Sequence, residues 1–224
     1  MTPSPLRLVI FDCDGVLVDS EGPSARVTAR EVSLLGWSIT AAEAMTRFMG
    51  LRLSDLPALV TAHTGRPVPP GWVEHVRGRL IDTLAHETEA MPGAAAALQA
   101  TAALGLPYRI ASNSSHEEMA VKFARTGLAS LVAGRIHSAR DVAAGKPAPD
   151  VFLAAAAAEG VAPQACIVVE DSLPGTRGAM AAGMACIGLD PHGPGEALRT
   201  AGAYPIQALS ELPALFRAAM RLAA

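Results

Sequence analysis

The chain has 224 residues, enough for one large domain or for a domain with a smaller insert. Half of the residues are hydrophobic and 17% are charged, which is typical of a globular protein. The formal net charge of −3 offers no basic surface for nucleic acid or anionic lipid, and no apolar run approaches the roughly 18 residues that span a bilayer.

The N-terminal stretch and the cysteines indicate the compartment. MTPSPLRLVIFDCDG lacks the basic segment, the apolar segment and the cleavage site of a secretory signal. Cys13, Cys166 and Cys186 are widely separated and odd in number, so we expect reduced, buried thiols. The histidines show no spacing typical of zinc ligands. We therefore expect a cytoplasmic monomer with no nucleic-acid or membrane partner.

Short apolar runs alternate with helical patterns over most of the chain. In chain order, strands are predicted at 7–12, 107–112, 134–137, 166–170, 185–189 and 204–207, and helices at 93–104, 117–126, 149–159 and 174–182. The four strong strand patterns are almost continuously apolar, as in strands that helices cover on both faces. A glycine follows each helical pattern, at Gly105, Gly127, Gly160 and Gly183, where C-terminal caps are expected. The alternation predicts an α/β fold with a doubly wound parallel, Rossmann-like sheet.

Residues 21–89 interrupt this alternation. They contain no convincing strand, only amphipathic helical patterns at 25–35, 41–48 and 72–86. The alternation resumes at Pro92-Gly93, a pair typical of a hinge or a helix start. We therefore predict a core of residues 1–20 and 90–224 with an inserted α-helical cap domain of residues 21–89.

Polar side chains stand at the ends of three strong strands and in one loop. They are Asp12 and Asp14 after the first strand, Ser112 and Asn113 at the second, Glu170 and Asp171 at 166–170, and Lys146 in the loop AAGKPAPD. Because ligands bind at the carboxyl ends of parallel strands, we expect these side chains to gather at one edge of the sheet.

Four clustered carboxylates facing one lysine are poorly compensated. Unit charges about 4 Å apart interact by roughly 1–4 kcal/mol at effective dielectric constants of 80 to 20, so a divalent cation is the natural partner. Oxygen ligands favour Mg²⁺ over zinc. With Lys146 and Ser112 beside it, such a site can hold a phosphate group. One carboxylate could then attack phosphorus while a second carries the proton.

Three other motifs fit less well. DCDGVLVDSEG has Val16 and Leu17 where an EF-hand loop needs a ligand and a glycine. AAGKP has Pro147 where a phosphate-binding P-loop needs Ser or Thr. PGTRGAMAAG lacks the GxG core of a dinucleotide site.

Taken singly, the same residues also have structural explanations. Asp12 and Asp14 can cap a loop after the strand, and Lys146 can be a solvated surface lysine. Ser112 can cap the next helix, although Ser114 or Ser115 with Glu117 or Glu118 matches a capping box.

Four segments, in this order and spacing, carry a resemblance to a known family: FDCDGVLVDSE, ASNSS, GKPAPD and VVEDSLPGTRGAMAAGM. They resemble the haloacid dehalogenase (HAD) superfamily, and within it the β-phosphoglucomutase-like branch of sugar-phosphate phosphatases with a helical cap. LDPHGP and ALSELPAL resemble phosphatases of the 6-phosphogluconate type.

The resemblance implies a role for each matching residue. Asp12 would be the nucleophile that forms an aspartyl-phosphate. Asp14 would protonate the leaving oxygen and then activate water, while its backbone carbonyl binds Mg²⁺. Ser112 and Lys146 would hold the phosphoryl group, with Asn113 beside them at the substrate.

The same resemblance completes the metal site. Asp171 would ligate Mg²⁺ together with Asp12 and Asp14, and Glu170 would be a further ligand or a partner behind the ligands. In the cap, Arg52 of FMGLRLSD is the candidate contact to an anionic or hydroxylated substrate, and a solvated arginine is the alternative.

The expected activity is Mg²⁺-dependent hydrolysis of a small phosphorylated metabolite, a sugar phosphate such as 6-phosphogluconate, by a phosphoric monoester hydrolase. The alternatives are phosphoryl transfer between sugar phosphates, as in β-phosphoglucomutase, and a non-catalytic metabolite-binding protein of the same fold. The mutase carries a histidine shortly after the first motif. Here Ser24 takes that position, and no histidine precedes His63, which favours hydrolysis.

Overall fold

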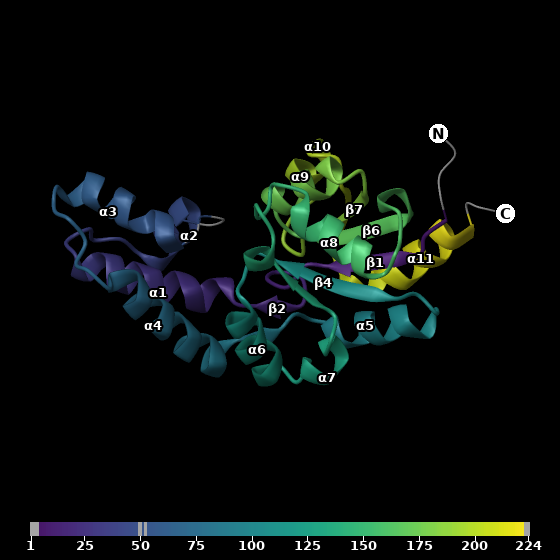
Figure 1. The fold of residues 1–224 in the computed structure, drawn as a ribbon, viewed down its shortest axis with the longest axis horizontal. Helices are drawn as coiled ribbons and strands as arrows, with labels where there is room; N and C mark the ends of the chain where they lie inside the picture. The colour runs from purple at the N-terminus through teal and green to yellow at the C-terminus, as the bar shows by residue number, and fades with distance from the viewer. Residues whose placement is uncertain (1–4, 49–50, 52, 222–224) are drawn as a thin grey trace. The chain divides into compact units, whose positions relative to one another are not determined.

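The computed structural model describes residues 5–48, 51 and 53–221, which divide into two compact units (Figure 1). Unit 1 contains the described residues up to 18 and from 90 onward, and unit 2 contains those in 19–89. The boundaries fall within two short strands, β2 (Val18–Asp19) and β3 (Glu89–Ala90). Within the described ranges, no helix is long and apolar enough to cross a membrane.

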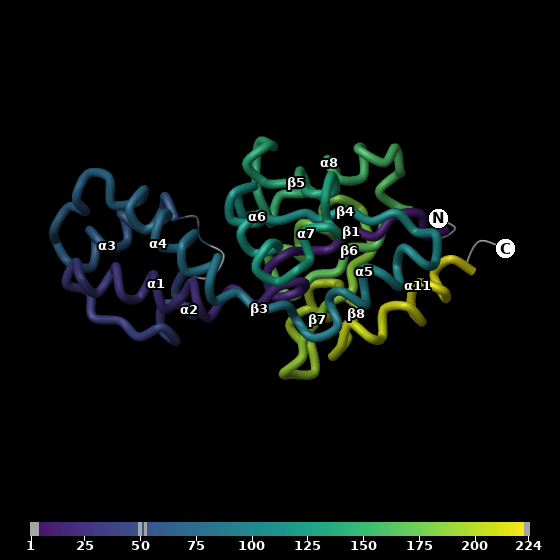
Figure 2. The backbone as a smooth tube through the Cα atoms, turned by 90° about the horizontal axis from the view of Figure 1, so that it is seen from below, coloured from purple at the N-terminus to yellow at the C-terminus, as the bar shows by residue number. Residues whose placement is uncertain are grey.

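Unit 1 is built on a sheet that has six strands in the described part of the chain. Their order is β5 (Ile136–Ser138), β4 (Tyr108–Ser112), β1 (Leu8–Phe11), β6 (Cys166–Glu170), β7 (Ala185–Leu189) and β8 (Tyr204–Ile206). Every neighbouring pair is parallel, and Figure 2 shows β1 between β4 and β6. The chain winds outward from β1 in both directions, so the predicted doubly wound parallel sheet is confirmed.

The central strand β1 shows how helices cover the sheet. Val9 and Phe11 pack into one apolar cluster, and Leu8 and Ile10 pack into another, because side chains alternate along a strand. The first cluster includes residues of α5 (Ala94–Ala103), α6 (His116–Arg125), α7 (Ala129–Val132) and α11 (Leu212–Arg221), and the second includes residues of α8 (Asp150–Ala158), α9 (Leu173–Ala181) and α10 (Glu196–Thr200). Burial of each apolar side chain stabilises the fold by about 1.5–3 kcal/mol. A strand whose residues are all apolar is therefore most stable at the centre of the sheet, where both of its faces are covered.

The predicted elements of unit 1 lie within one or two residues of the observed ones at each end. Glycine caps follow four helices: Gly105, Gly127, Gly160 and Gly183 adopt φ values of 73°, 73°, 62° and 73°. The capping box at α6 is formed by Ser115 and Glu118, whose side chains each accept a hydrogen bond from the other's backbone N–H. Helices α7, α10 and α11 were absent from the prediction.

Unit 2, over its described residues, contains four α-helices. They are α1 (Glu21–Leu34), α2 (Ala41–Phe48), α3 (Leu56–Thr64) and α4 (Trp72–Glu87). Val32, Val60 and Val76 are fully buried in their common core. Trp37 stacks on His63 at 4.1 Å and meets the edge of Phe48 at 5.5 Å between ring centroids. The prediction omitted α3. Arg52 lies outside the described residues.

We expect all three cysteine thiols to be inert in the native protein. Burial raises the pKa of Cys166 to about 11 and that of Cys186 to about 12, and it raises the pKa of Cys13 well above its usual value. Because only the thiolate reacts quickly, Ellman's reagent at pH 8 should modify less than one thiol per native chain within minutes. In urea it should modify all three. One rapidly modified thiol in the native protein would contradict this burial.

Candidate active site

The carboxyl ends of β4, β1 and β6 lie side by side at one edge of the sheet. Ser112 ends β4, Asp12 follows β1 and Glu170 ends β6. The backbone N–H of Asp12 donates to the Val169 carbonyl at 2.9 Å, which extends the pairing with β6 by one residue. The predicted gathering of these polar residues therefore follows from strand order.

Lys146 forms the centre of this edge. Its Nζ donates to Asp12 Oδ1 at 2.5 Å and to Glu170 Oε1 at 2.7 Å, and the three side chains are 4%, 9% and 0% exposed. Burial alone would lower the pKa of Lys146, but the two carboxylates outweigh burial and hold that pKa above its usual value. Lys146 is therefore a buried, paired cation, which rules out the solvated surface lysine considered above.

Asn113 holds the backbone of Lys146 in place. Its Oδ1 accepts from the Lys146 N–H at 2.9 Å, and its Nδ2 donates to the Lys146 carbonyl at 3.3 Å. A Cβ at Gly145 would press against this amide, at 2.8 Å from Asn113 Oδ1. The Lys146–Pro147 peptide bond that follows is cis. Asn113 thus orients the lysine, and its predicted contact with the substrate stays a prediction.

Glu170 is fully enclosed by protein donors. Oε2 accepts hydrogen bonds from the N–H groups of Asp171 and Ser172, at 3.0 and 2.9 Å, and from Ser172 Oγ at 2.8 Å. Oε1 accepts from Lys146. A Cβ at Gly175 would overlap this carboxylate, so the glycine makes room for it in the first turn of α9. Three donors saturate Oε2, whereas Oε1 accepts from Lys146 alone.

Asp14 lies in a second group of polar side chains. Its Oδ1 accepts from Lys122 Nζ at 2.6 Å, and its Oδ2 accepts from Ser114 Oγ at 2.9 Å and from Ser112 Oγ at 3.4 Å. The Lys122 side chain is 3% exposed. Lys122 and Ser114 were not among the predicted site residues. The sequence did carry a signal for Lys122: it lies on the same face of α6 as the apolar Met119 and Phe123, where a lysine indicates a buried charge with a partner.

Three carboxylates lie close enough to share a metal ion. Asp12, Glu170 and Asp171 each offer an oxygen, and these atoms lie within 4.8 Å of one another. Gly15, at φ +77°, allows this arrangement, since a Cβ there would overlap the Asp171 carboxylate. Burial raises the pKa of Asp12 to about 7; Lys146 opposes this shift, and Glu170 and Asp14 add to it. An oxygen-only donor set with excess negative charge fits Mg²⁺.

The structure thus groups six predicted site residues in two neighbouring sets. They are Asp12, Lys146, Glu170 and Asp171 in one set and Asp14 and Ser112 in the other. The hydroxyl of Ser112 also accepts from the N–H of Ser114 at 3.0 Å, so it stabilises the turn after β4 as well. Arg52 is outside the described residues, so the structure places it in neither set.

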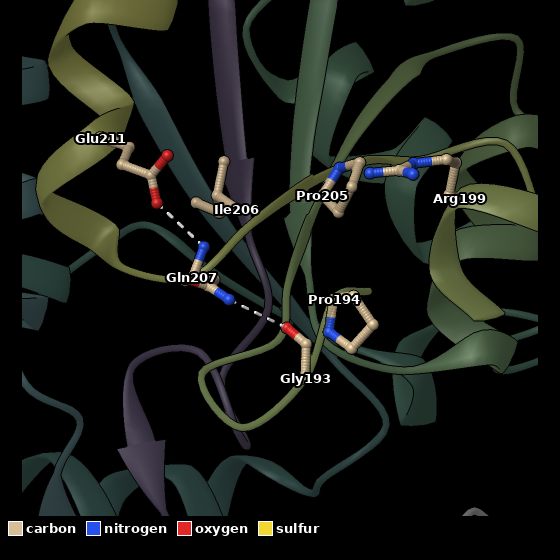
Figure 3. Close-up of a pocket in the computed structure, with 7 residues that line it drawn as sticks. All are labelled: Gly193, Pro194, Arg199, Pro205, Ile206, Gln207 and Glu211. Carbon is tan, nitrogen blue, oxygen red and sulfur yellow. Dashed lines mark hydrogen bonds between the residues drawn. The ribbon is translucent and has the colours of Figure 1, made fainter. Parts of the chain in front are cut away.

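A separate depression of about 280 Å³ lies beside β8 (Figure 3). It is lined by Gly193, Pro194, Arg199, Pro205, Ile206, Gln207 and Glu211. Gln207 bridges it, with its N–H donating to Glu211 Oε1 at 2.9 Å and its Nε2 donating to the Gly193 carbonyl at 3.3 Å. Asp190, in the LDPHGP segment, supports the same loop by accepting from the Gly195 N–H at 2.9 Å. These contacts account for the depression as the packing of a loop, and none of the predicted site residues that the structure describes lines it.

A doubly wound sheet with clustered carboxylates and a buried lysine at its strand ends defines an α/β enzyme that handles phosphate groups. The haloacid dehalogenase-like hydrolase family matches residues 6–183, and the chain belongs to this family. The predicted family is confirmed, and so is the predicted class of phosphoric monoester hydrolase.

Individual relatives agree with this assignment. The 6-phosphogluconate phosphatase of Escherichia coli (strain K12) is 31% identical over 192 residues, covering 84% of this chain and 86% of the relative. Hexitol phosphatase A of the same organism is 34% identical over 185 residues, covering 78% of both chains. A HAD family hydrolase from Deinococcus radiodurans R1, solved with bound phosphate and sodium, has a TM-score of 0.79 and 32% identity, covering 98% of this chain and 99% of the other.

We expect Asp12→Asn to stabilise the metal-free protein. The pKa of Asp12 is about 7 in the folded chain against 3.8 for an exposed aspartate, so its ionisation opposes folding increasingly as pH rises from about 4 to 7. In EDTA at pH 8, the melting temperature of the variant should be a few degrees higher than that of the wild type, because each kcal/mol of stability shifts the melting temperature of a chain of this size by a few degrees. The difference should shrink toward pH 4. A variant that melts lower at pH 8 would contradict this expectation. It would show that losing the ion pair with Lys146 costs more stability than removing the buried Asp12 charge returns.

Proposed function

We propose that the protein is a Mg²⁺-dependent phosphatase that hydrolyses a small phosphorylated metabolite, a sugar phosphate such as 6-phosphogluconate, through an aspartyl-phosphate on Asp12. The observation that carries the proposal is the buried Lys146 between Asp12 and Glu170 at the ends of adjacent strands. Relatives named 6-phosphogluconate phosphatase and hexitol phosphatase support a sugar phosphate as the substrate.

In the first step, a carboxylate oxygen of Asp12 attacks phosphorus while the bond from phosphorus to the ester oxygen breaks. Asp14 gives its proton to that oxygen, and the alcohol leaves. In the second step, water attacks the phosphorus of the aspartyl-phosphate, Asp14 takes the proton of the water, and Asp12 is released with inorganic phosphate. Lys146 and Ser112 bind the phosphoryl oxygens during both steps.

Asp12, Asp171 and the backbone carbonyl of Asp14 would hold Mg²⁺, which supplies positive charge that reduces the repulsion between the Asp12 carboxylate and the phosphate. Glu170 is better suited to orient Lys146 and the turn at 171–172, because four protein donors already occupy its oxygens. Of the two roles that were left open for Glu170, we therefore favour the partner behind the ligands.

The helical unit 2 takes the role of a cap in this proposal and selects the substrate. Arg52 remains our predicted cap contact to the substrate. The small phosphorylated substrate is the proposed partner, and the monomeric state and the cytoplasmic location remain predictions.

Phosphate release from p-nitrophenyl phosphate should require Mg²⁺ and Asp12. Asp12→Asn should lower turnover by more than about a thousandfold, because it removes the nucleophile. Asp171→Ala should raise the required Mg²⁺ concentration by about 100-fold, because it removes a ligand. Asp82→Asn, an exposed aspartate on α4, is the control and should behave as the wild type. Activity in excess EDTA, or activity restored by zinc alone, would contradict the metal assignment.

We expect the phosphoryl group to pass to water, not to a second sugar. Ser24, in the first turns of α1, replaces the histidine expected of a mutase, and a serine hydroxyl is not a base near neutral pH. The enzyme should be given β-glucose 1-phosphate with catalytic glucose 1,6-bisphosphate and Mg²⁺, while glucose 6-phosphate and free phosphate are followed together.

The same measurement extends to a panel of 6-phosphogluconate, hexitol phosphates, phosphoglycolate and nucleotides. Release of phosphate from a sugar phosphate, without isomerisation, is the expected result. Isomerisation faster than phosphate release would establish the mutase activity instead.

A further inference from the structure

Lys122 is a buried charge that the reaction outlined above does not use. It lies on α6 beside the buried residues Met119 and Phe123 and is itself buried. Its Nζ donates to Asp14 Oδ1 at 2.6 Å and to Ser114 Oγ at 2.8 Å. An apolar residue would fill this helix position without the cost of burying an ammonium group. The lysine therefore serves its partners, not the packing of the helix.

The partners of Lys122 fix both oxygens of Asp14. Lys122 binds Oδ1, while Ser114 binds Oδ2 and also accepts from Lys122, which closes a triangle of hydrogen bonds. A carboxylate held at both oxygens has its rotamer and its plane fixed. The Asp14 carboxylate, 2.6 Å from the Lys122 Nζ, compensates the buried ammonium group.

We propose that Lys122 is a positioning residue that, with Ser114, aims the Asp14 carboxyl group at the ester oxygen of the substrate. This inference rests on the proposed function, in which Asp14 gives its proton to that oxygen. Lys122 itself touches neither the phosphoryl group nor the leaving group in this role. Its positive charge also stabilises Asp14 as a carboxylate after the proton has passed to the leaving oxygen and before Asp14 takes the proton of water.

If Lys122 positions the proton donor, its loss should affect alkyl phosphates and aryl phosphates differently. The alkoxide of a sugar is strongly basic and leaves only when it receives a proton, whereas p-nitrophenolate leaves readily without one. Loss of Lys122 should therefore impair alkyl phosphates more than aryl phosphates. Ground-state binding of phosphate, which Lys146 and Ser112 provide, should not change.

The test compares Lys122→Met with the wild type in saturating Mg²⁺. For the alkyl phosphate that is turned over fastest in the panel above, kcat/KM should fall by about 100-fold, the cost expected of a misplaced proton donor. For p-nitrophenyl phosphate, it should fall by about tenfold or less. The inhibition constant of inorganic phosphate should stay within about threefold of the wild-type value. Ser114→Ala should shift the alkyl-to-aryl ratio in the same direction.

Met119→Leu is the matched control, because Met119 is a buried neighbour on α6 without a contact to Asp14 among the described contacts. It should leave the alkyl-to-aryl ratio unchanged. An unchanged ratio in Lys122→Met, or the same loss in Met119→Leu, would overturn the positioning role. Absence of phosphate release by the wild type would instead overturn the proposed function itself.

A second measurement keeps the pairing testable if Lys122→Met is unstable. Asp14→Asn leaves the buried Lys122 without its carboxylate and should lower the melting temperature. Adding Lys122→Met to Asp14→Asn should recover part of that loss, because the unpaired charge is removed. Additive losses in the double variant would show that the two groups are not coupled, which would also overturn the inference.

Discussion

The ammonium group of Lys146, buried between Asp12 and Glu170, is the constraint on which the site depends. A buried charge is tolerated only when opposite charges and hydrogen bonds compensate it, so the surrounding residues must hold this lysine closely. Asn113 fixes its backbone through both amide atoms, and Gly175 makes room for the Glu170 carboxylate. The strand order β4-β1-β6 then places Asn113, Asp12 and Glu170, which stand at the ends of these strands, side by side.

The pleat of β1 and the turn after it separate the acids into two groups. Cys13 lies between Asp12 and Asp14 and is fully buried in the core cluster that also contains Phe11. The two aspartates are therefore two residues apart, yet each has its own cation: Lys146 for Asp12 and Lys122 for Asp14. This division lets two carboxylates with different chemical tasks stay close without sharing a partner.

Much of this arrangement could be predicted from sequence because it is local. The strong strand patterns are almost continuously apolar and the acids stand at or just after their ends, so strand ends and site residues were found together. Lys122 could not be found in this way, since its contact with Asp14 joins residues 108 positions apart and a helical lysine is ordinarily solvated. Ser115 and Ser114 both satisfied the capping pattern, and only the backbone of α6 assigns the cap to Ser115. Of the missed helices, α3 and α11 each have a proline in the first turn, which a short pattern does not distinguish from a loop. The other two, α7 and α10, are only four and five residues long.

The glycines show that the acid cluster is a property of the backbone as much as of the carboxylates. At Gly15 and at Gly175, a single methyl group would overlap a carboxylate, so any other residue would force Asp171 or Glu170 away from its place. Gly15 also adopts a positive φ, which side chains other than that of glycine disfavour. Repulsion among the carboxylates would favour looser packing here, whereas these glycines, with Lys146 and the N–H groups of Asp171 and Ser172, keep the acids close. The fold thus retains negative charge at one edge of the sheet that a core built for stability alone would exclude. This charge can bind a cation, and a cation held there can in turn bind a phosphate group.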